Sequence, residues 1–225
     1  MMSKFTIFVF TKTKNNNMKG YSRQTTKDLD ILRKNVKEII TEVNLYLEKR
    51  LMLEVEWGNL GADIKLVDLF ASSSESQMTQ DITKEFQSIW TKAIRKVLFK
   101  YLKGSNFNEG SHFDIILDGE EYEIKTTSAH WTNEWAGNKN SLHKVGKHIL
   151  IKYKLGDYGV DEVVILVVDL KSCTETRWNP GTSSGTSFSS LKIHASDIGH
   201  VDILAGSIIL KPQAKKWLTP VTEKI

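Results

Sequence analysis

The chain has 225 residues, a formal net charge of +4 and a single cysteine, Cys173. This length suits one domain with a sizeable core, the mild positive charge permits a nucleic-acid partner without requiring one, and one cysteine excludes an internal disulfide or a cysteine-rich zinc site. The apolar run at residues 5–10 is too short for a signal-peptide core, and no later stretch approaches the roughly 18 apolar residues of a membrane span. We therefore expect a cytoplasmic protein.

The first part of the chain is predicted to be mainly helical. Met1–Phe10 is expected to form a short strand, and a polar, basic loop follows it. After a capping residue at Thr25 or Thr26, apolar residues recur with a 3.6-residue period as far as Arg50, which predicts an amphipathic helix. Leu51–Trp57 alternates between apolar and polar residues and is expected to be a strand.

The second part is predicted to contain a long helix followed by strands and decorated loops. The helix runs from about Thr79 to Lys103 and ends at Gly104. The later strands are predicted at His148–Leu155, Glu162–Leu170, Ser190–Ala195 and Ile203–Leu210. Glu162–Leu170 is apolar enough to be a central strand that is covered on both faces. Helices with a central mixed sheet predict an α/β (α+β) fold in one domain, residues 1–225.

Phe113 to Lys125 is predicted to form a β-hairpin. Asp118-Gly119 separates two runs of strand-like sequence, and this dipeptide favours a two-residue turn because both of its residues need positive φ. Such a turn places Asp114 opposite Glu123. Alternation then gives the hairpin an apolar face and a polar face, and the polar face carries Asp114, Glu121, Glu123 and Lys125.

The two opposed carboxylates on this polar face need an explanation. Directly opposed residues of two strands lie about 4.5–5.5 Å apart, where like charges destabilise the pair. A divalent cation between Asp114 and Glu123 would remove the repulsion, with Lys125 pointing to the same side. The alternative is an ordinary solvated face of a hairpin, on which charged residues are common.

The residues Phe113-Asp114 and then Glu123-Ile124-Lys125 resemble the signature of the PD-(D/E)xK nuclease superfamily. The preceding helix carries a glutamate, Glu85, as in that family, whereas Phe113 stands where the family often has proline. The resemblance covers residues 79–170 and implies a restriction-endonuclease-like core, a central mixed β-sheet flanked by helices. Residues 1–78 would then be an N-terminal helical part.

The resemblance implies a magnesium-dependent phosphodiesterase. Mg²⁺ prefers oxygen ligands from one or two carboxylates together with water and substrate phosphate. The resemblance places Asp114, Glu123 and Ile124 at the metal, and Lys125 where it would orient or deprotonate the attacking water. Glu85 would add an outer-shell or second-metal ligand. Hydrolysis would leave a 5′-phosphate and a 3′-hydroxyl.

A small member of this family with long polar loops is similar to a type II restriction endonuclease. Such an enzyme cuts double-stranded DNA at a palindrome as a homodimer, and a cognate DNA methyltransferase is expected in the same system. Base readout needs paired donors and acceptors, which the loops at about 127–147 and 171–190 carry. The candidate DNA-contact residues are Thr127, Ser128, His130, Trp131, Asn133, Asn138, Lys139, Asn140, His143, Lys144, Lys147, Arg177, Trp178, Asn179, Thr182 and Ser183.

Several alternatives stay open. A DNA-repair nicking endonuclease or a junction resolvase would share the same fold and site. A catalytically inactive DNA-binding protein is a second alternative, against which the intact Asp114, Glu123 and Lys125 argue. For Trp131 and Trp178, packing in a core or a subunit interface is as good an interpretation as contact with DNA.

Overall fold

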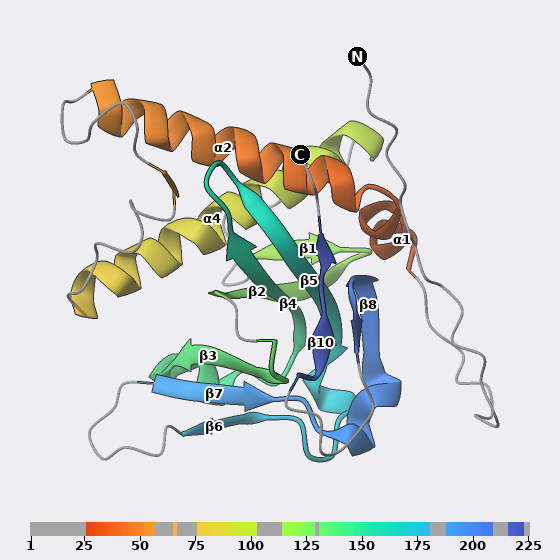
Figure 1. Cartoon of the computed structure of the whole chain (residues 1–225). Helices are drawn as coiled ribbons and strands as arrows, with labels where there is room; N and C mark the ends of the chain where they lie inside the picture. Colours follow the sequence, from red (N-terminus) through yellow and green to blue (C-terminus); the bar gives the residue numbers. More distant parts are fainter. Residues whose placement is uncertain are drawn as a thin grey trace.

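The structure is a computed structural model that describes residues 26–56, 65–66, 76–102, 114–128, 131–180, 188–208 and 216–222. The side chains of residues 54–55, 76–83, 128 and 188 are outside this description. Helices lie over a central mixed sheet, and a smaller sheet lies on the other side of it (Figure 1). The predicted α/β class is therefore confirmed. The predicted N-terminal strand at Met1–Phe10 lies outside the described residues.

The helices are α1 Lys27–Lys34, α2 Val36–Glu56 and α4 Ser76–Tyr101. The first predicted helix is thus two helices, because the chain leaves helical geometry at Asn35, which has φ −114° and ψ 22°. The prediction of a strand at Leu51–Trp57 is wrong as far as Glu56, since α2 continues to that residue. Leu51 packs one helical turn beyond the buried Leu47, so helical spacing prevails over alternation here.

The central sheet has the strand order β1-β2-β4-β5-β11, and β8 also pairs with β5. β2 and β4 are parallel, and the other neighbours are antiparallel. The hairpin and the two following strands lie where they were predicted, and the last predicted strand is interrupted at Gly206, which has φ 79°. The strand bounds are β1 Ile115–Leu117, β2 Glu120–Ser128, β4 Lys147–Leu155, β5 Val160–Asp169, β8 Val201–Ala205 and β11 Val221–Thr222.

Each face of the central sheet is covered by its own layer. Alternate residues of β4 and β5 belong to two separate apolar clusters, as the two-residue period of a strand requires. One cluster joins the sheet to the helices, where Phe86 of α4 stacks on Tyr153 of β4 with ring centroids 4.8 Å apart. The other cluster joins it to Trp135, Trp178 and Leu191. β5 is therefore covered on both faces, as predicted.

The second layer is a three-stranded antiparallel sheet of order β3-β7-β6, drawn at the bottom of Figure 1. It contains β3 Glu134–Asn138, β6 Trp178–Pro180 and β7 Phe188–Lys192. The segments predicted as long loops, at about 127–147 and 171–190, thus contribute β3 and β6, and the predicted strand at Ser190–Ala195 begins earlier. The chain also forms the short pair β9 Ser207–Ile208 and β10 Leu218–Thr219, and 3-10 helices at Lys139–His143, Leu170–Ser172 and Ala195–His200.

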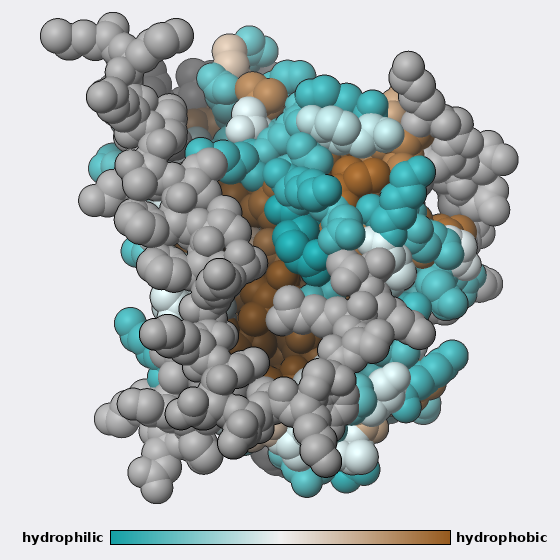
Figure 2. All heavy atoms as spheres, turned by 90° about the vertical axis from the view of Figure 1, so that its right-hand side faces the viewer, coloured by the Kyte–Doolittle hydropathy of each residue, from teal (hydrophilic) through white to brown (hydrophobic). Residues whose placement is uncertain are grey.

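Where the described residues are visible from the side of α1 and β8, hydrophilic residues predominate, and hydrophobic residues form a band near the centre (Figure 2). On β8, Val201 and Ile203 are partly buried against the second cluster. No helix in the described ranges is long and apolar enough to cross a membrane.

Candidate active site

The hairpin forms with the predicted register. Ile115 pairs with Tyr122 and Leu117 with Glu120, and the turn residues Asp118 and Gly119 have φ of 48° and 79°. The turn is also tied to α1, because the Asp118 N–H donates to the Asp28 carboxylate and the Asp28 N–H donates to the Asp118 carboxylate. The polar face of the hairpin is therefore held in the predicted orientation.

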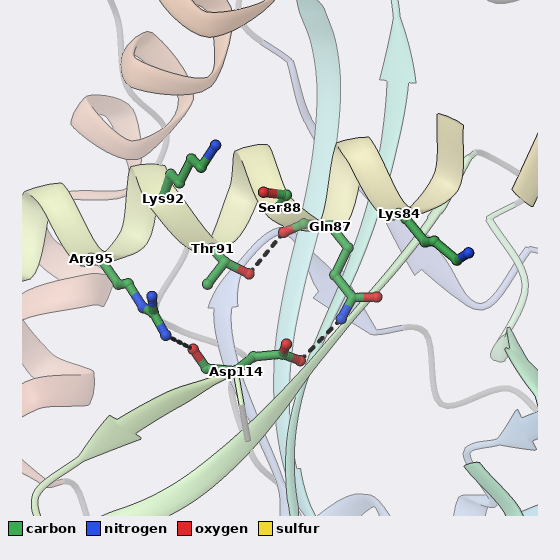
Figure 3. A pocket seen from close by; sticks show the side chains of 7 residues that line it. All are labelled: Lys84, Gln87, Ser88, Thr91, Lys92, Arg95 and Asp114. Atoms are coloured by element: carbon green, nitrogen blue, oxygen red, sulfur yellow. Dashed lines mark hydrogen bonds between the residues drawn. The ribbon is translucent and has the colours of Figure 1, made fainter. Parts of the chain in front are cut away.

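Asp114 lies immediately before the edge strand β1 and is held by three donors, of which Figure 3 shows Gln87 and Arg95. Its Oδ2 accepts from the Ile124 N–H at 2.7 Å and from Gln87 Nε2 at 3.0 Å, while Arg95 Nη2 donates to its backbone carbonyl at 2.6 Å. Among the described residues, none donates to Oδ1. Burial, and then the neighbouring Glu123 carboxylate, raise the pKa of Asp114. The position of the carboxylate is thus set by α4 and β2 together, with one oxygen left for a ligand.

Glu123 is buried on β2 between two ammonium groups. Its Oε1 lies 2.6 Å from Lys125 Nζ and its Oε2 lies 2.5 Å from Lys144 Nζ. Burial alone would raise the pKa of Glu123, but the charges and hydrogen bonds of the two lysines outweigh it and lower that pKa. The Glu123 carboxylate is therefore held ionised at neutral pH.

Glu85 does not join this cluster. Its Oε1 pairs with Arg50 Nε of α2 at 2.9 Å, on the side of α4 that faces the neighbouring helix. Gln87 contacts Asp114 instead, because two residues along a helix correspond to about 200° of rotation. The prediction for Glu85 is corrected accordingly, and sequence reasoning missed Gln87. The signal for it was a row of polar residues at helical spacing on the predicted helix, beside its apolar residues.

The segment before β4 brings one of the predicted DNA-contact lysines into the site. Lys144 follows the 3-10 helix Lys139–His143 and reaches Glu123. Lys147 Nζ lies 3.8 Å from Glu120 Oε2 and above the ring of Tyr122. The side chains of Asn138, Lys139, Asn140 and His143 are exposed near this segment.

Two predicted DNA-contact residues are buried. Asn133 is 7% exposed and donates to the Ile193 carbonyl at 2.6 Å. Trp178 is 6% exposed, and its indole N–H donates to His148 Nε2 at 3.1 Å. Trp131 is partly buried against the same cluster. Packing, the alternative interpretation for the tryptophans, therefore accounts for Trp131 and Trp178, and a buried hydrogen bond accounts for Asn133.

The remaining predicted contact residues are exposed, partly buried or outside the described residues. Arg177 is exposed, and Asn179, which is partly exposed, donates to the Arg177 carbonyl. Thr127 is partly buried on the polar face of β2. Residues outside the description are His130, Thr182 and Ser183, together with the side chain of Ser128.

His148 links the site to the second layer. It is the register partner of Glu123 across the parallel ladder, and its Nδ1 lies 2.8 Å from the Gly146 carbonyl. Burial lowers the pKa of His148 from 6.5 to about 4. The imidazole is therefore neutral at pH 7, with Nδ1–H as donor and Nε2 as acceptor of the Trp178 indole. Sequence reasoning missed this role.

Asp114 and Glu123 are the carboxylates of this site that could bind a magnesium ion. No group of three or more His, Cys, Asp or Glu side chains that could enclose a metal occurs in the described part of the chain. Mg²⁺, however, keeps most of its water and takes only one or two protein carboxylates. Asp114 and Glu123 are hard oxygen donors of that number, and two lysines now balance the charge of one of them. The residues present fit this ion.

No protein-family model matches the chain, and a search of curated proteins found no similar sequence. A pair of carboxylates beside a largely buried lysine, whose side chain is 11% exposed, can hold a hard cation and position a water molecule.

Proposed function

We propose that this protein is a magnesium-dependent endonuclease that hydrolyses double-stranded DNA at a specific sequence, on a restriction-endonuclease-like core. One observation carries the proposal. Asp114, Glu123 and Lys125 converge on a two-residue hairpin, and the Asp114 pKa is raised by burial and by the Glu123 carboxylate. Groups that repel each other in the folded protein are typical of a site built for a charged ligand.

The residues of the chain have separable roles in such a reaction. A bound Mg²⁺ would supply charge stabilisation at the phosphate and a more acidic water. Asp114 and Glu123 would hold that ion, and the Ile124 N–H and Gln87 orient the Asp114 carboxylate. Lys125, held by Glu123, would orient or deprotonate the attacking water. The products would carry a 5′-phosphate and a 3′-hydroxyl.

Sequence-specific cutting of both strands is the form of the activity we favour. Exposed side chains, among them Asn138, Asn140 and Arg177, have the donors and acceptors that read base edges in the major groove. A homodimer would present two such sites to the two strands of a palindrome. A cognate DNA methyltransferase would then protect the host DNA.

The proposal is tested with Asp114→Asn and Lys125→Met. We expect each to lower the rate of DNA cleavage by at least about 100-fold, because each removes a group that acts on the reacting phosphate or water. Binding to the same duplex in Ca²⁺ should persist. Glu121→Gln is the matched control, since Glu121 is exposed on the same strand and should leave cleavage unchanged.

Three outcomes would change the assignment. Unchanged cleavage in Asp114→Asn would exclude this site. A single nick per duplex by the wild-type protein would identify a nicking endonuclease or resolvase instead. Tight binding without any cleavage in Mg²⁺ or Mn²⁺ would identify an inactive DNA-binding protein.

A further inference from the structure

A cleft of about 330 Å³ runs along α4 beside Asp114 (Figure 3). One face of α4 supplies most of its lining, and Asp114 lies across from this helix face. The lining residues of α4 are Lys84, Gln87, Ser88, Thr91, Lys92 and Arg95. They are cationic or neutral hydrogen-bonding groups, without one apolar side chain.

The spacing of these residues makes the cleft elongated. They recur at intervals of three and four, so they form one stripe along the helix. From Lys84 to Arg95 the stripe extends about 16 Å, at about 1.5 Å per residue. A stripe of this length is long enough to contact more than one phosphate of a DNA strand that follows it.

Two cations of the stripe have no carboxylate partner in the described part of the chain. Lys92 makes no ion pair there, and Arg95 donates to the Asp114 backbone carbonyl, not to a carboxylate. The cations on another face of the same helix differ, since Lys96 pairs with Glu42 and Lys100 with Glu38. The helix thus neutralises Lys96 and Lys100 and leaves Lys92 and Arg95 beside the candidate active site.

We infer that this cleft binds the sugar–phosphate backbone of the DNA strand that leads to Asp114. The inference rests on the proposed function for its ligand. Lysine, arginine, serine and glutamine are the side chains that contact phosphates, and such contacts fix the register of a protein on DNA without reading its sequence. Because Gln87 belongs both to the stripe and to the support of Asp114, the bound strand is aligned with the carboxylate that acts on it.

The test compares two variants of the full chain that change the net charge equally. Lys92→Gln alters the cleft, and Lys96→Gln alters the other face of the same helix. The dissociation constant of a fluorescent duplex is measured by anisotropy without divalent ions at several salt concentrations. We expect the cleft variant to bind about 3-fold more weakly and to lower the salt slope by about one, with the control near wild type.

Several results would overturn the inference. These are equal weakening by both variants, no weakening by the cleft variant, or no binding of duplex by the wild-type protein. Circular dichroism checks that both variants are folded.

The inference and the proposed function can fail separately. Binding through the cleft without cleavage in Mg²⁺ would keep the inference and remove the nuclease. Cleavage by the wild-type protein with equal binding by the two variants would keep the nuclease and remove the inference.

Discussion

Glu123 lies between two ammonium groups, and their charges offset its repulsion of the Asp114 carboxylate. Lys125 and Lys144 each contact one oxygen of Glu123 within hydrogen-bond distance. The side chain of Lys144 is 32% exposed and that of Lys125 is 11% exposed, so Lys144 can withdraw into solvent more easily. Lys144 therefore competes with any cation that approaches Glu123, while Lys125 stays as part of the site.

We predict that Lys144→Met strengthens Ca²⁺ binding several-fold, because it removes a positive charge that occupies a Glu123 oxygen. Isothermal titration calorimetry measures this affinity without DNA. Lys147→Met is the control, since Lys147 lies 3.8 Å from the exposed Glu120. Weaker or unchanged Ca²⁺ binding in Lys144→Met would show that the cation does not bind at Glu123.

At the scale of the element, α4 presents different faces to three neighbours. Its apolar face packs on the central sheet through Phe86 and Trp90, and Glu85 faces α2 through Arg50. Its third face carries Gln87 and Arg95 to Asp114. The helix is thus both a structural layer and the support of one carboxylate of the site.

This division of the faces of α4 predicts different effects on the cleavage rate for substitutions at Gln87 and Glu85. Gln87→Ala should lower the cleavage rate about 10-fold with little loss of stability, because Asp114 Oδ2 loses one of its two donors. Glu85→Ala should leave the rate unchanged and cost less than about 1 kcal/mol of unfolding free energy, as for a partly exposed ion pair. Initial rates and urea unfolding measure the two effects. A larger loss of activity in Glu85→Ala than in Gln87→Ala would contradict the structure.

At the scale of the whole molecule, the candidate site lies between the two apolar clusters that cover the faces of the central sheet. Residues paired in a parallel ladder share a face of the sheet, so Glu123 and Lys125 lie on the side of His148 and Leu150. That side is covered by the three-stranded sheet, to which His148 is bonded through Trp178. The neutral imidazole of His148 on β4 therefore links the three-stranded sheet to the strand next to β2, which carries Glu123 and Lys125.

Stability should consequently fall as the pH is lowered from about 6.5 to about 4. The unfolded chain protonates His148 near its usual pKa of 6.5, whereas in the folded protein burial lowers that pKa to about 4. The unfolded state thus binds more protons in this window, and the loss reaches about 3 kcal/mol at its lower end. Urea unfolding at pH 7 and pH 5 measures it. His148→Gln should lose this part of the pH dependence, and His143→Gln, an exposed control, should keep it. An equal change of unfolding free energy with pH in the wild-type protein and both variants would contradict the assignment of this effect to His148.

The hairpin and the long helix α4 could be predicted from the sequence because both depend on local patterns, an Asp-Gly turn and a helical period. The predicted end of the helix before Leu51 was wrong because short apolar runs satisfy the periods of helix and strand alike. The three-stranded sheet was missed because its strands are short and pair with distant segments. Glu85 was preferred to Gln87 because the sequence does not tell which margin of a helix turns toward the hairpin, and the Lys144–Glu123 pair depends on the docking of β4 beside β2.

The most direct test of the central claim is digestion of a long duplex DNA by the purified protein in Mg²⁺, followed by sequencing of the fragment ends. The proposal predicts discrete fragments whose ends carry 5′-phosphates and share one sequence, and no fragments from Asp114→Asn. Intact DNA in both Mg²⁺ and Mn²⁺, or ends that share no sequence, would contradict it.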